Sequence, residues 1–209
     1  MSIQKTRHIK RHKTHITRED KEILLNQKGA LIWFTGLPAS GKSTIANSLE
    51  KELYKQDYLT IVMDGDNIRH GLNKDLGFSQ KDRYENIRRI GEVAKLFVET
   101  GILTITAFIS PYSADRDNVR FMLKNSKFIE IYLKCPLSEL EKRDPKGFYK
   151  KAKDGLIKEF TGISAPYEAP LNPEIVLDTS KLSQKECVKT ILHYLNSVRV
   201  LDNLQNSAT

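Results

Sequence analysis

The sequence from Gly36 to Ser43 reads GLPASGKS and lies between an apolar run and an amphipathic stretch. It matches the pattern GxxxxGK followed by Ser or Thr, which cradles the phosphates of a nucleoside triphosphate when it connects a strand to a helix. That context is present, because Ala30–Thr35 is apolar and β-prone, and residues 42–56 carry apolar side chains at helical spacing. A chance glycine turn would not need these neighbours. The stretch therefore predicts an α/β protein that binds a nucleoside triphosphate.

The chemistry of this loop assigns a role to each of its parts. Consecutive backbone N–H groups wrap the β-phosphate, and the N-terminus of the following helix adds the positive end of its dipole. Lys42 is expected to reach the β- and γ-phosphates of ATP, and Ser43 to bind Mg²⁺. The predicted nucleotide-binding residues are Gly36, Leu37, Pro38, Ala39, Ser40, Gly41, Lys42, Ser43 and Thr44.

Short apolar runs alternate with helical stretches along the rest of the chain. Strands are predicted at Thr60–Asp64 and at residues 103–109, 128–133 and 175–177. Two capping-box patterns, at Ser79 and Ser183, predict helices over residues 79–100 and 183–196. Strands that alternate with helices pair in parallel through right-handed crossovers, and continuously apolar strands are covered on both faces. We therefore predict a P-loop NTPase-type, doubly wound parallel sheet of about five strands with helices on both faces.

We expect a single kinase domain over residues 19–200, with a basic, mobile tail over residues 1–18 and a C-terminal tail over residues 201–209. Residues 144–173 break the alternating pattern, since they are rich in Lys, Gly and Pro and too polar for a core. Long segments of this kind in compact domains are often lids. Four aromatic residues within it indicate that it packs onto something, and we predict a mobile lid.

Charge and cysteine content exclude several classes of protein. The formal net charge is +8, and residues 1–28 hold eight Lys/Arg against three acids, so a nucleic-acid arm is one interpretation of the tail. A solvated terminus is favoured, because no aromatic residue for base stacking precedes Trp33. No apolar run approaches the ~20 residues of a membrane span, and we expect a cytoplasmic enzyme. Cys135 and Cys187 form no metal-binding or disulfide pattern.

Two carboxylates follow the second predicted strand. At the carboxyl end of a strand beside the phosphate loop, a carboxylate can accept the proton of a substrate hydroxyl or hold the shell of Mg²⁺. We assign the first role to Asp66 and the second to Asp64, together with Ser43. The alternative is a plain turn, because the residues around Asp64 are also favourable turn formers.

Five further motifs carry a family resemblance. They are DGDNIRHGLN at residues 64–73, LGFS at 76–79, FISPY at 108–112, RDPKG at 143–147 and FTGI at 160–163. In this order, and with the phosphate loop, the series resembles the adenylyl-sulfate kinase (APS kinase) family from about Thr14 to the last helix. The resemblance implies an ATP- and Mg²⁺-dependent transfer of phosphate to the 3′-hydroxyl of adenosine 5′-phosphosulfate (APS). It also implies a homodimer and a mobile lid.

The resemblance also implies site residues. Those that would line the acceptor site are Asp66, Arg69, Phe78, Arg83, Asn86, Ile109, Ser110, Lys146 and Phe160. Phe78 and Phe160 could enclose the adenine, and Arg143 could stack on the adenine of ATP. The catalytic candidates are Lys42, Asp66 and Ser110. The resemblance marks Ser110 as a possible phosphoserine, whereas the chemistry of phosphoryl transfer favours direct transfer without it.

Two departures from the family pattern and two rival functions stay open at this point. Pro38 removes an N–H from the phosphate loop, and Glu159 stands before Phe160 where glycine is expected. One rival is another P-loop kinase, acting on a nucleoside, gluconate or shikimate. The other is a nucleotide-dependent module whose basic tail binds nucleic acid. Arg88 and Arg89 fit either a ligand site or a solvated helix face paired with Glu85 and Glu92.

Overall fold

The computed structural model describes residues 10, 12, 14–124, 126–144 and 146–202. Its centre is a five-stranded sheet in the order β2-β3-β1-β4-β5, with every pair of neighbours parallel. The strands are β1 (Ala30–Thr35), β2 (Thr60–Asp64), β3 (Leu103–Ala107), β4 (Lys127–Lys134) and β5 (Ile175–Asp178). Each lies where the sequence predicts one, although β3 ends at Ala107 rather than at residue 109.

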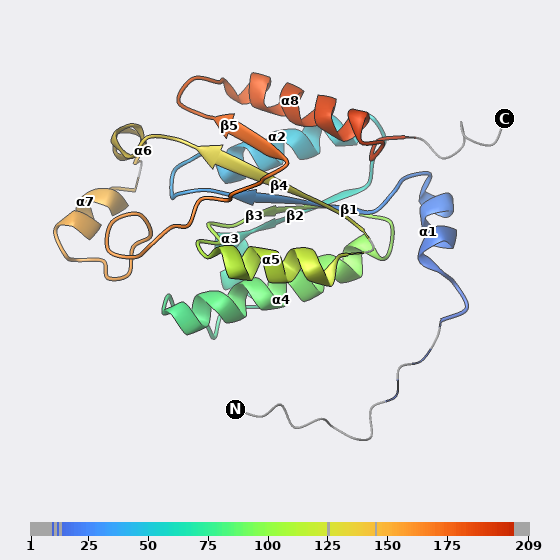
Figure 1. Ribbon diagram of the computed structural model, residues 1–209, viewed down its shortest axis with the longest axis horizontal. Coiled ribbons are helices and arrows are strands. Elements are labelled where there is room, and N and C mark those ends of the chain that lie inside the picture. Colours follow the sequence, from blue (N-terminus) through green and yellow to red (C-terminus); the bar gives the residue numbers. More distant parts are fainter. Residues whose placement is uncertain (1–9, 11, 13, 125, 145, 203–209) are drawn as a thin grey trace.

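Helices cover both faces of the sheet (Figure 1). Helices α2 (Lys42–Tyr54) and α8 (Gln184–Ser197) pack together on one face, and α4 (Gln80–Val98) and α5 (Ser113–Met122) on the other. The remaining helices are α1 (Arg18–Leu25), α3 (Gly65–Arg69), α6 (Leu137–Arg143) and α7 (Phe148–Lys153). The doubly wound parallel architecture is confirmed.

The central strand β1 shows why both faces must be covered. All six of its residues are buried. Ala30, Ile32 and Phe34 pack into the core beneath α2 and α8, whereas Leu31 and Trp33 pack into the core beneath α4 and α5. Alternate side chains of a strand point to opposite faces, so an unbroken apolar run requires two cores. This places the loop after β1 at the middle of the sheet's carboxyl edge.

The sequence did not predict α1, α3, α5, α6 or α7. Helix α1 begins within the predicted tail, where Thr17 and Asp20 make a complete capping box; the tail residues 1–9, 11 and 13 and residues 203–209 lie outside the described residues. The capping box predicted at Ser183 is complete as well. At Ser79 the hydroxyl accepts from the backbone N–H of Asp82 and donates to its carboxylate. None of the helices in the described ranges has the length and apolar character that crossing a bilayer requires.

Candidate active site

The phosphate loop connects β1 to α2 at the carboxyl edge of the sheet. Gly36 has φ +152°, and a Cβ there would lie 2.7 Å from the carbonyl oxygen of Leu133, so only glycine fits. Helix α2 begins at Lys42 without a side-chain cap, which leaves the N–H groups of its first turn open to an anion. The loop is therefore shaped to receive phosphate groups.

Lys42 is folded into this loop. Its ammonium donates to the carbonyl oxygens of Gly36, at 2.9 Å, and Leu37, at 2.8 Å. Burial lowers the pKa of Lys42 to about 7, although the carboxylates of Asp64 and Asp66 act in the opposite direction. The lysine is thus held by the carbonyl groups of the loop itself.

Ser43 and Asp64 meet beside the loop. The Ser43 hydroxyl donates to Asp64 Oδ2 at 2.5 Å, and Asp64 Oδ1 accepts from the backbone N–H of Asp66 at 3.0 Å. Hydroxyl and carboxylate oxygens are the hard ligands that Mg²⁺ prefers, and Mg²⁺ at nucleotide sites uses few protein ligands besides phosphates and water. In the described part of the chain, no group of three or more His, Cys, Asp or Glu residues could hold a resident metal. On ligand chemistry, the Ser43 hydroxyl and the Asp64 carboxylate are a donor pair that fits Mg²⁺.

Asp66 lies close to the predicted lid. Its side chain is 79% exposed and forms an ion pair with the Lys146 ammonium at 3.3 Å. The structure thus brings a predicted catalytic carboxylate and a predicted lid cation together at the open edge of the sheet. The exposure leaves the carboxylate accessible to a ligand.

The acceptor side is centred on Phe78, whose side chain is 59% exposed. The guanidinium carbon of Arg69 lies 4.4 Å from the ring centroid, and that of Arg83 lies 5.7 Å from it. Arg69 also donates to the carbonyl oxygens of Leu76 and Gly77, at 3.0 Å each. An exposed aromatic ring with two cationic groups close to it is suited to an anionic ligand that carries a base.

Arg83 joins the Phe78 loop to the lid. It donates through Nε to the carbonyl oxygen of Phe78 at 2.9 Å and through Nη2 to that of Glu159 at 2.6 Å. Phe160 follows Glu159 and rests edge-on against Tyr149, with ring centroids 4.9 Å apart. Glu159 has φ +54°, the left-handed region that favours glycine, which explains why glycine is expected there. Arg83 thus positions the backbone on both sides of the predicted adenine site.

The other predicted acceptor residues are more buried. Asn86 accepts from the Asn73 side-chain amide at 2.9 Å, and the carbonyl oxygen of Ile109 accepts from the Thr35 hydroxyl at 2.7 Å. Ser110 is 2% exposed, and its hydroxyl accepts from the Trp33 indole N–H at 3.1 Å. A partner that donates does not activate a hydroxyl as a nucleophile, because activation needs a base.

Three arginines that the sequence analysis considered as ligand contacts have partners within the chain. Arg143 donates to the carbonyl oxygen of Thr179 at 2.7 Å, and no contact with the phosphate loop is described for it. Arg88 pairs with Glu85 and Glu92, and Arg89 pairs with Glu85 and Asp75. Arg88 and Arg89 therefore form ion pairs on the surface of α4, which was the alternative to a role in a ligand site.

The predicted lid, residues 144–173, packs over the phosphate loop. The Tyr149 hydroxyl donates to the carbonyl oxygen of Pro38 at 2.9 Å, so the residue that lacks an N–H contributes an acceptor instead. Gly162 lies so close to the loop that a Cβ there would be 2.7 Å from Leu37 Cδ2. Tyr149 was assigned no specific role from the sequence. The available signal was that Tyr149 is one of the few aromatic residues in a segment rich in Lys, Gly and Pro.

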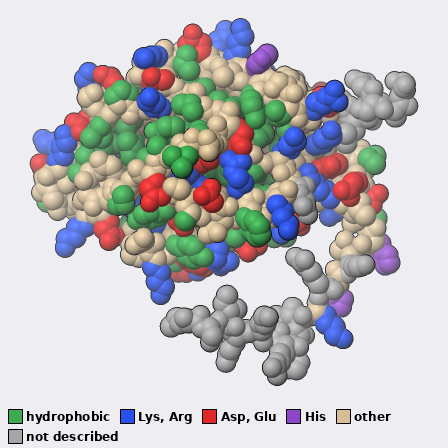
Figure 2. Space-filling model, in the orientation of Figure 1, with side chains coloured by type: hydrophobic (Ala, Val, Ile, Leu, Met, Phe, Trp, Pro, Cys, Tyr) green, Lys and Arg blue, Asp and Glu red, His purple; other side chains and the backbone are tan. Residues whose placement is uncertain are grey.

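A second hollow lies at the opposite edge of the sheet. It has a volume of about 640 Å³ and is lined largely by cationic side chains. On the side of the molecule that carries α1, the surface shows several Lys and Arg side chains (Figures 1 and 2). Among the residues that line the hollow are Arg18, Lys28, Lys124, Lys127 and Arg199. Ligands of doubly wound sheets bind at the carboxyl ends of the strands, and this hollow adjoins the starts of β1 and β4. It does not belong to the nucleotide site.

Comparison with known proteins agrees with this geometry. A model of the adenylylsulphate kinase family matches residues 28–178. The adenylyl-sulfate kinase of Oceanobacillus iheyensis is 58% identical over 193 residues, covering 92% of this chain and 97% of that protein. The adenylyl-sulfate kinase of Clostridium acetobutylicum is 53% identical over 201 residues, covering 96% of this chain and 100% of that protein.

A solved structure is also similar. The APS kinase of Mycobacterium tuberculosis, in complex with AMPPNP and APS, matches with a TM-score of 0.79 at 42% identity, covering 81% of this chain and 99% of that one. The family match spans the phosphate loop, the acceptor side and the predicted lid. The chain belongs to the adenylylsulphate kinase family.

Proposed function

We propose that the chain transfers the γ-phosphate of ATP to the 3′-hydroxyl of APS and releases ADP and 3′-phosphoadenosine 5′-phosphosulfate. Family membership supports the reaction. The observation that carries the assignment to this site is the ion pair between Asp66 and Lys146. Asp66 follows Asp64, which contacts Ser43 at the end of the phosphate loop, and it lies on the same short helix as Arg69, which packs on Phe78. The donor phosphates and an acceptor nucleotide would then face each other across Asp66.

On the donor side, the open N–H groups at the start of α2 bind the phosphates of ATP. Lys42 leaves the carbonyl oxygens of Gly36 and Leu37 and turns to the γ-phosphate, because a charge-assisted bond to phosphate is stronger than a bond to a carbonyl group. Ser43 and Asp64 would hold Mg²⁺, directly or through its water shell. When bound, Mg²⁺ supplies positive charge that neutralises the phosphate oxygens.

On the acceptor side, Phe78 and Phe160 provide aromatic surface for the adenine of APS, with Arg69 beside it. Asp66 orients the 3′-hydroxyl and accepts its proton. The hydroxyl oxygen forms its bond to the γ-phosphorus as the bond to the bridging oxygen of ADP breaks. Lys146, released from Asp66, then lies over the transferring group and helps to exclude water.

We further propose that transfer is direct, with no phosphoserine at Ser110. The hydroxyl of Ser110 is buried and held by the Trp33 N–H, which supports a role in shaping the loop. A Ser110→Ala variant that keeps more than about half of the wild-type turnover excludes an obligatory phosphoenzyme. Labelled phosphate trapped on Ser110 during turnover would contradict direct transfer.

A homodimer and a cytoplasmic location complete the proposal. Exposed apolar side chains on α4 and α5, namely Tyr84, Leu96 and Phe121, support self-association. Sedimentation velocity distinguishes a dimer from a monomer or a larger assembly.

The reaction is tested by ADP release with ATP, Mg²⁺ and one acceptor at a time. APS, adenosine 5′-monophosphate, gluconate and shikimate are compared, and the phosphorylated position of the product is assigned by NMR. Turnover with APS alone, at the 3′-position, is expected. Turnover only with another acceptor would support the rival small-molecule kinase. Turnover with none would favour the nucleic-acid-binding module, which requires residues 1–13 for binding.

A further inference from the structure

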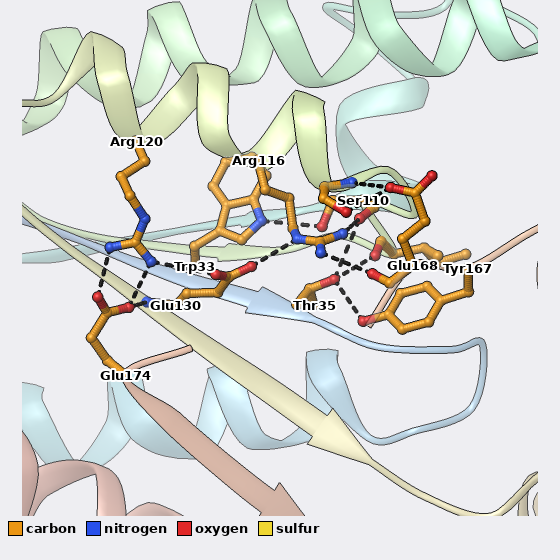
Figure 3. Close-up of polar contacts among 11 residues, drawn as sticks. Trp33, Thr35, Ser110, Arg116, Arg120, Glu130, Tyr167, Glu168 and Glu174 are labelled. Atoms are coloured by element: carbon orange, nitrogen blue, oxygen red, sulfur yellow. Dashed lines mark hydrogen bonds and ion pairs between the residues drawn. The ribbon is translucent and has the colours of Figure 1, made fainter. Parts of the chain in front are cut away.

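Arg116 lies in α5, outside every residue set assigned to the reaction. It is 2% exposed, and its three donor nitrogens reach three different segments of the chain (Figure 3). Nε donates to Glu130 Oε1 on β4 at 2.7 Å, Nη1 to the carbonyl oxygen of Ser110 at 2.7 Å, and Nη2 to that of Glu168 at 2.8 Å. A buried guanidinium needs a charged partner and hydrogen bonds for its other donors. Here those hydrogen bonds are accepted by backbone carbonyl oxygens of two segments. One is the loop of residues 109–111 after β3, the acceptor loop, and the other is the end of the predicted lid at Glu168.

Arg120 lies one turn later on the same helix and shares the same carboxylate. Its Nη2 lies 3.3 Å from Glu130 Oε2, and its guanidinium forms a second, two-pronged pair with Glu174 at 2.6 and 2.8 Å. Among the described contacts, Arg120 reaches neither Ser110 nor Glu168. The two arginines therefore share an ion-pair network, and only Arg116 extends it to the acceptor loop (Figure 3).

The backbone of Ser110 needs such support. Its φ of +40° is unusual for a residue other than glycine, and such conformations persist only when the surroundings enforce them. Arg116 holds the Ser110 carbonyl oxygen, Trp33 holds its hydroxyl, and Thr35 holds the preceding carbonyl oxygen of Ile109. Strained backbone of this kind is concentrated at functional sites.

The end of the lid segment is fastened to the same loop. The N–H of Glu168 donates to the carbonyl oxygen of Pro111 at 2.8 Å, and its carboxylate accepts from the N–H and hydroxyl of Ser113, at 2.7 and 2.6 Å. The Tyr167 hydroxyl lies 3.0 Å from the Thr35 hydroxyl, at the end of β1. The loop after β3, the lid end and the strand before the phosphate loop thus form one connected unit.

We infer that Arg116 is a positioning residue that fixes residues 109–111 in the shape the acceptor requires and anchors the lid to them. This inference rests on the proposed function, in which that loop contacts APS. A residue that served stability alone would be expected to behave like Arg120, which pairs with the same glutamate. Arg116 instead donates two of its three hydrogen bonds to backbone carbonyl groups, one in the acceptor loop and one at the end of the predicted lid.

The test compares Arg116→Lys with the matched control Arg120→Lys. Lysine keeps the charge toward Glu130, but one ammonium cannot span the three acceptors that a planar guanidinium reaches. For Arg116→Lys, kcat/KM for APS is expected to fall about 10- to 100-fold, as misplaced reacting groups do, while KM for ATP stays near the wild-type value. Arg120→Lys is expected to keep wild-type kinetics. Equal kinetic effects in the two variants, or a parallel rise of both KM values in Arg116→Lys, would overturn the inference.

A second readout does not depend on activity. Trp33 is the only tryptophan of the chain, and its indole contacts the Ser110 hydroxyl, so its fluorescence reports on the loop. Arg116→Lys is expected to shift the emission of Trp33 and increase its quenching by acrylamide, whereas Arg120→Lys is not. Unchanged emission in Arg116→Lys overturns the inference. If the wild-type protein does not phosphorylate APS, the proposed function fails, but this comparison still decides the role of Arg116.

A milder variant covers the case in which Arg116→Lys does not fold. Glu130→Gln keeps an acceptor oxygen for Arg116 and removes the charge. It is expected to raise KM for APS and to change Trp33 emission in the same direction, with KM for ATP unchanged. A folded Glu130→Gln protein with wild-type KM for APS and wild-type emission would contradict the proposed anchor.

Discussion

The donor and acceptor sides of the site are built in different ways. The donor side is one stretch of eight residues, Gly36 to Ser43, in which Lys42 bonds to carbonyl groups of its own loop. The acceptor side is drawn from four separate segments, around Asp66, Phe78, Ser110 and the lid. Arginines donating to backbone carbonyl groups, as Arg83 does to Phe78 and Glu159, hold these segments together. The geometry of a contiguous motif is set largely by its local sequence, whereas a site assembled from several segments depends on contacts between residues that are distant in sequence.

The largest expected effect is on the donor side. Lys42→Ala removes the cation that meets the γ-phosphate, and kcat should fall about 10³- to 10⁵-fold, the range for cations that stabilise a transferring phosphoryl group. Steady-state ADP release with APS measures it. The matched control is Lys51→Ala, on an exposed position of the same helix, which should keep wild-type turnover. A Lys42→Ala enzyme with near-normal kcat would remove this lysine from the reaction.

Asp66→Asn tests the point at which the two sides meet. Loss of the proton acceptor should lower kcat about 100- to 1,000-fold, with a smaller change in KM, because the carboxylate acts chiefly in the transition state. Asp64→Asn is the comparison, and its effect should lessen as the Mg²⁺ concentration is raised. An unchanged kcat in Asp66→Asn would show that another group receives the proton.

Phe78→Ala should affect the acceptor side alone. Loss of a stacked base costs about 1–3 kcal/mol, which corresponds to a rise in KM for APS of roughly 5- to 150-fold. KM for ATP should stay constant, because Phe78 makes no described contact with the phosphate loop. Tyr54→Ala, at an exposed aromatic residue on α2, is the control. Equal increases in both KM values would show that the two sides are not separate.

The smallest expected effect is the uptake of up to one proton when ATP binds. Burial lowers the pKa of Lys42 to about 7, so at pH 8 the lysine is mostly neutral in the free enzyme. Bound phosphate raises that pKa again, so ATP should bind with proton uptake at pH 8 and with little uptake at pH 6, and affinity should weaken as the pH rises above 7. Calorimetry in buffers of different ionisation enthalpy measures the uptake, and Lys42→Met should abolish it. Identical uptake at both pH values would contradict the lowered pKa.

Much of the fold could be predicted from local signals. Unbroken apolar strands and the loop at Gly36 specify a parallel sheet covered on both faces, and Ser183 with Glu186 marks the start of α8. Helix α5 was missed because four of its ten residues are charged, and two of these, Asp115 and Arg116, are buried. Their burial depends on partners distant in sequence, which no periodicity displays.

The same limit applies to the site. The motifs identified Asp66, Phe78 and Ser110 as candidates, but not the contacts that hold them. Arg116 could have been suspected from its partner, because Glu130 interrupts the otherwise apolar core of β4 and a buried carboxylate requires a cation. The packing of α5 on the sheet decides which cation pairs with Glu130. Only this packing shows that the same cation, Arg116, also reaches Ser110.

Hydrogen–deuterium exchange tests the separation of the two sides most directly. The protein is labelled with a non-hydrolysable ATP analogue and Mg²⁺ alone, with APS alone, and with both ligands. The analogue alone should protect amides of residues 36–45 and leave residues 76–83 as in the free protein, whereas APS alone should protect the second set. Either ligand alone protecting both sets to the same extent would contradict a contiguous donor site joined to an independently assembled acceptor site.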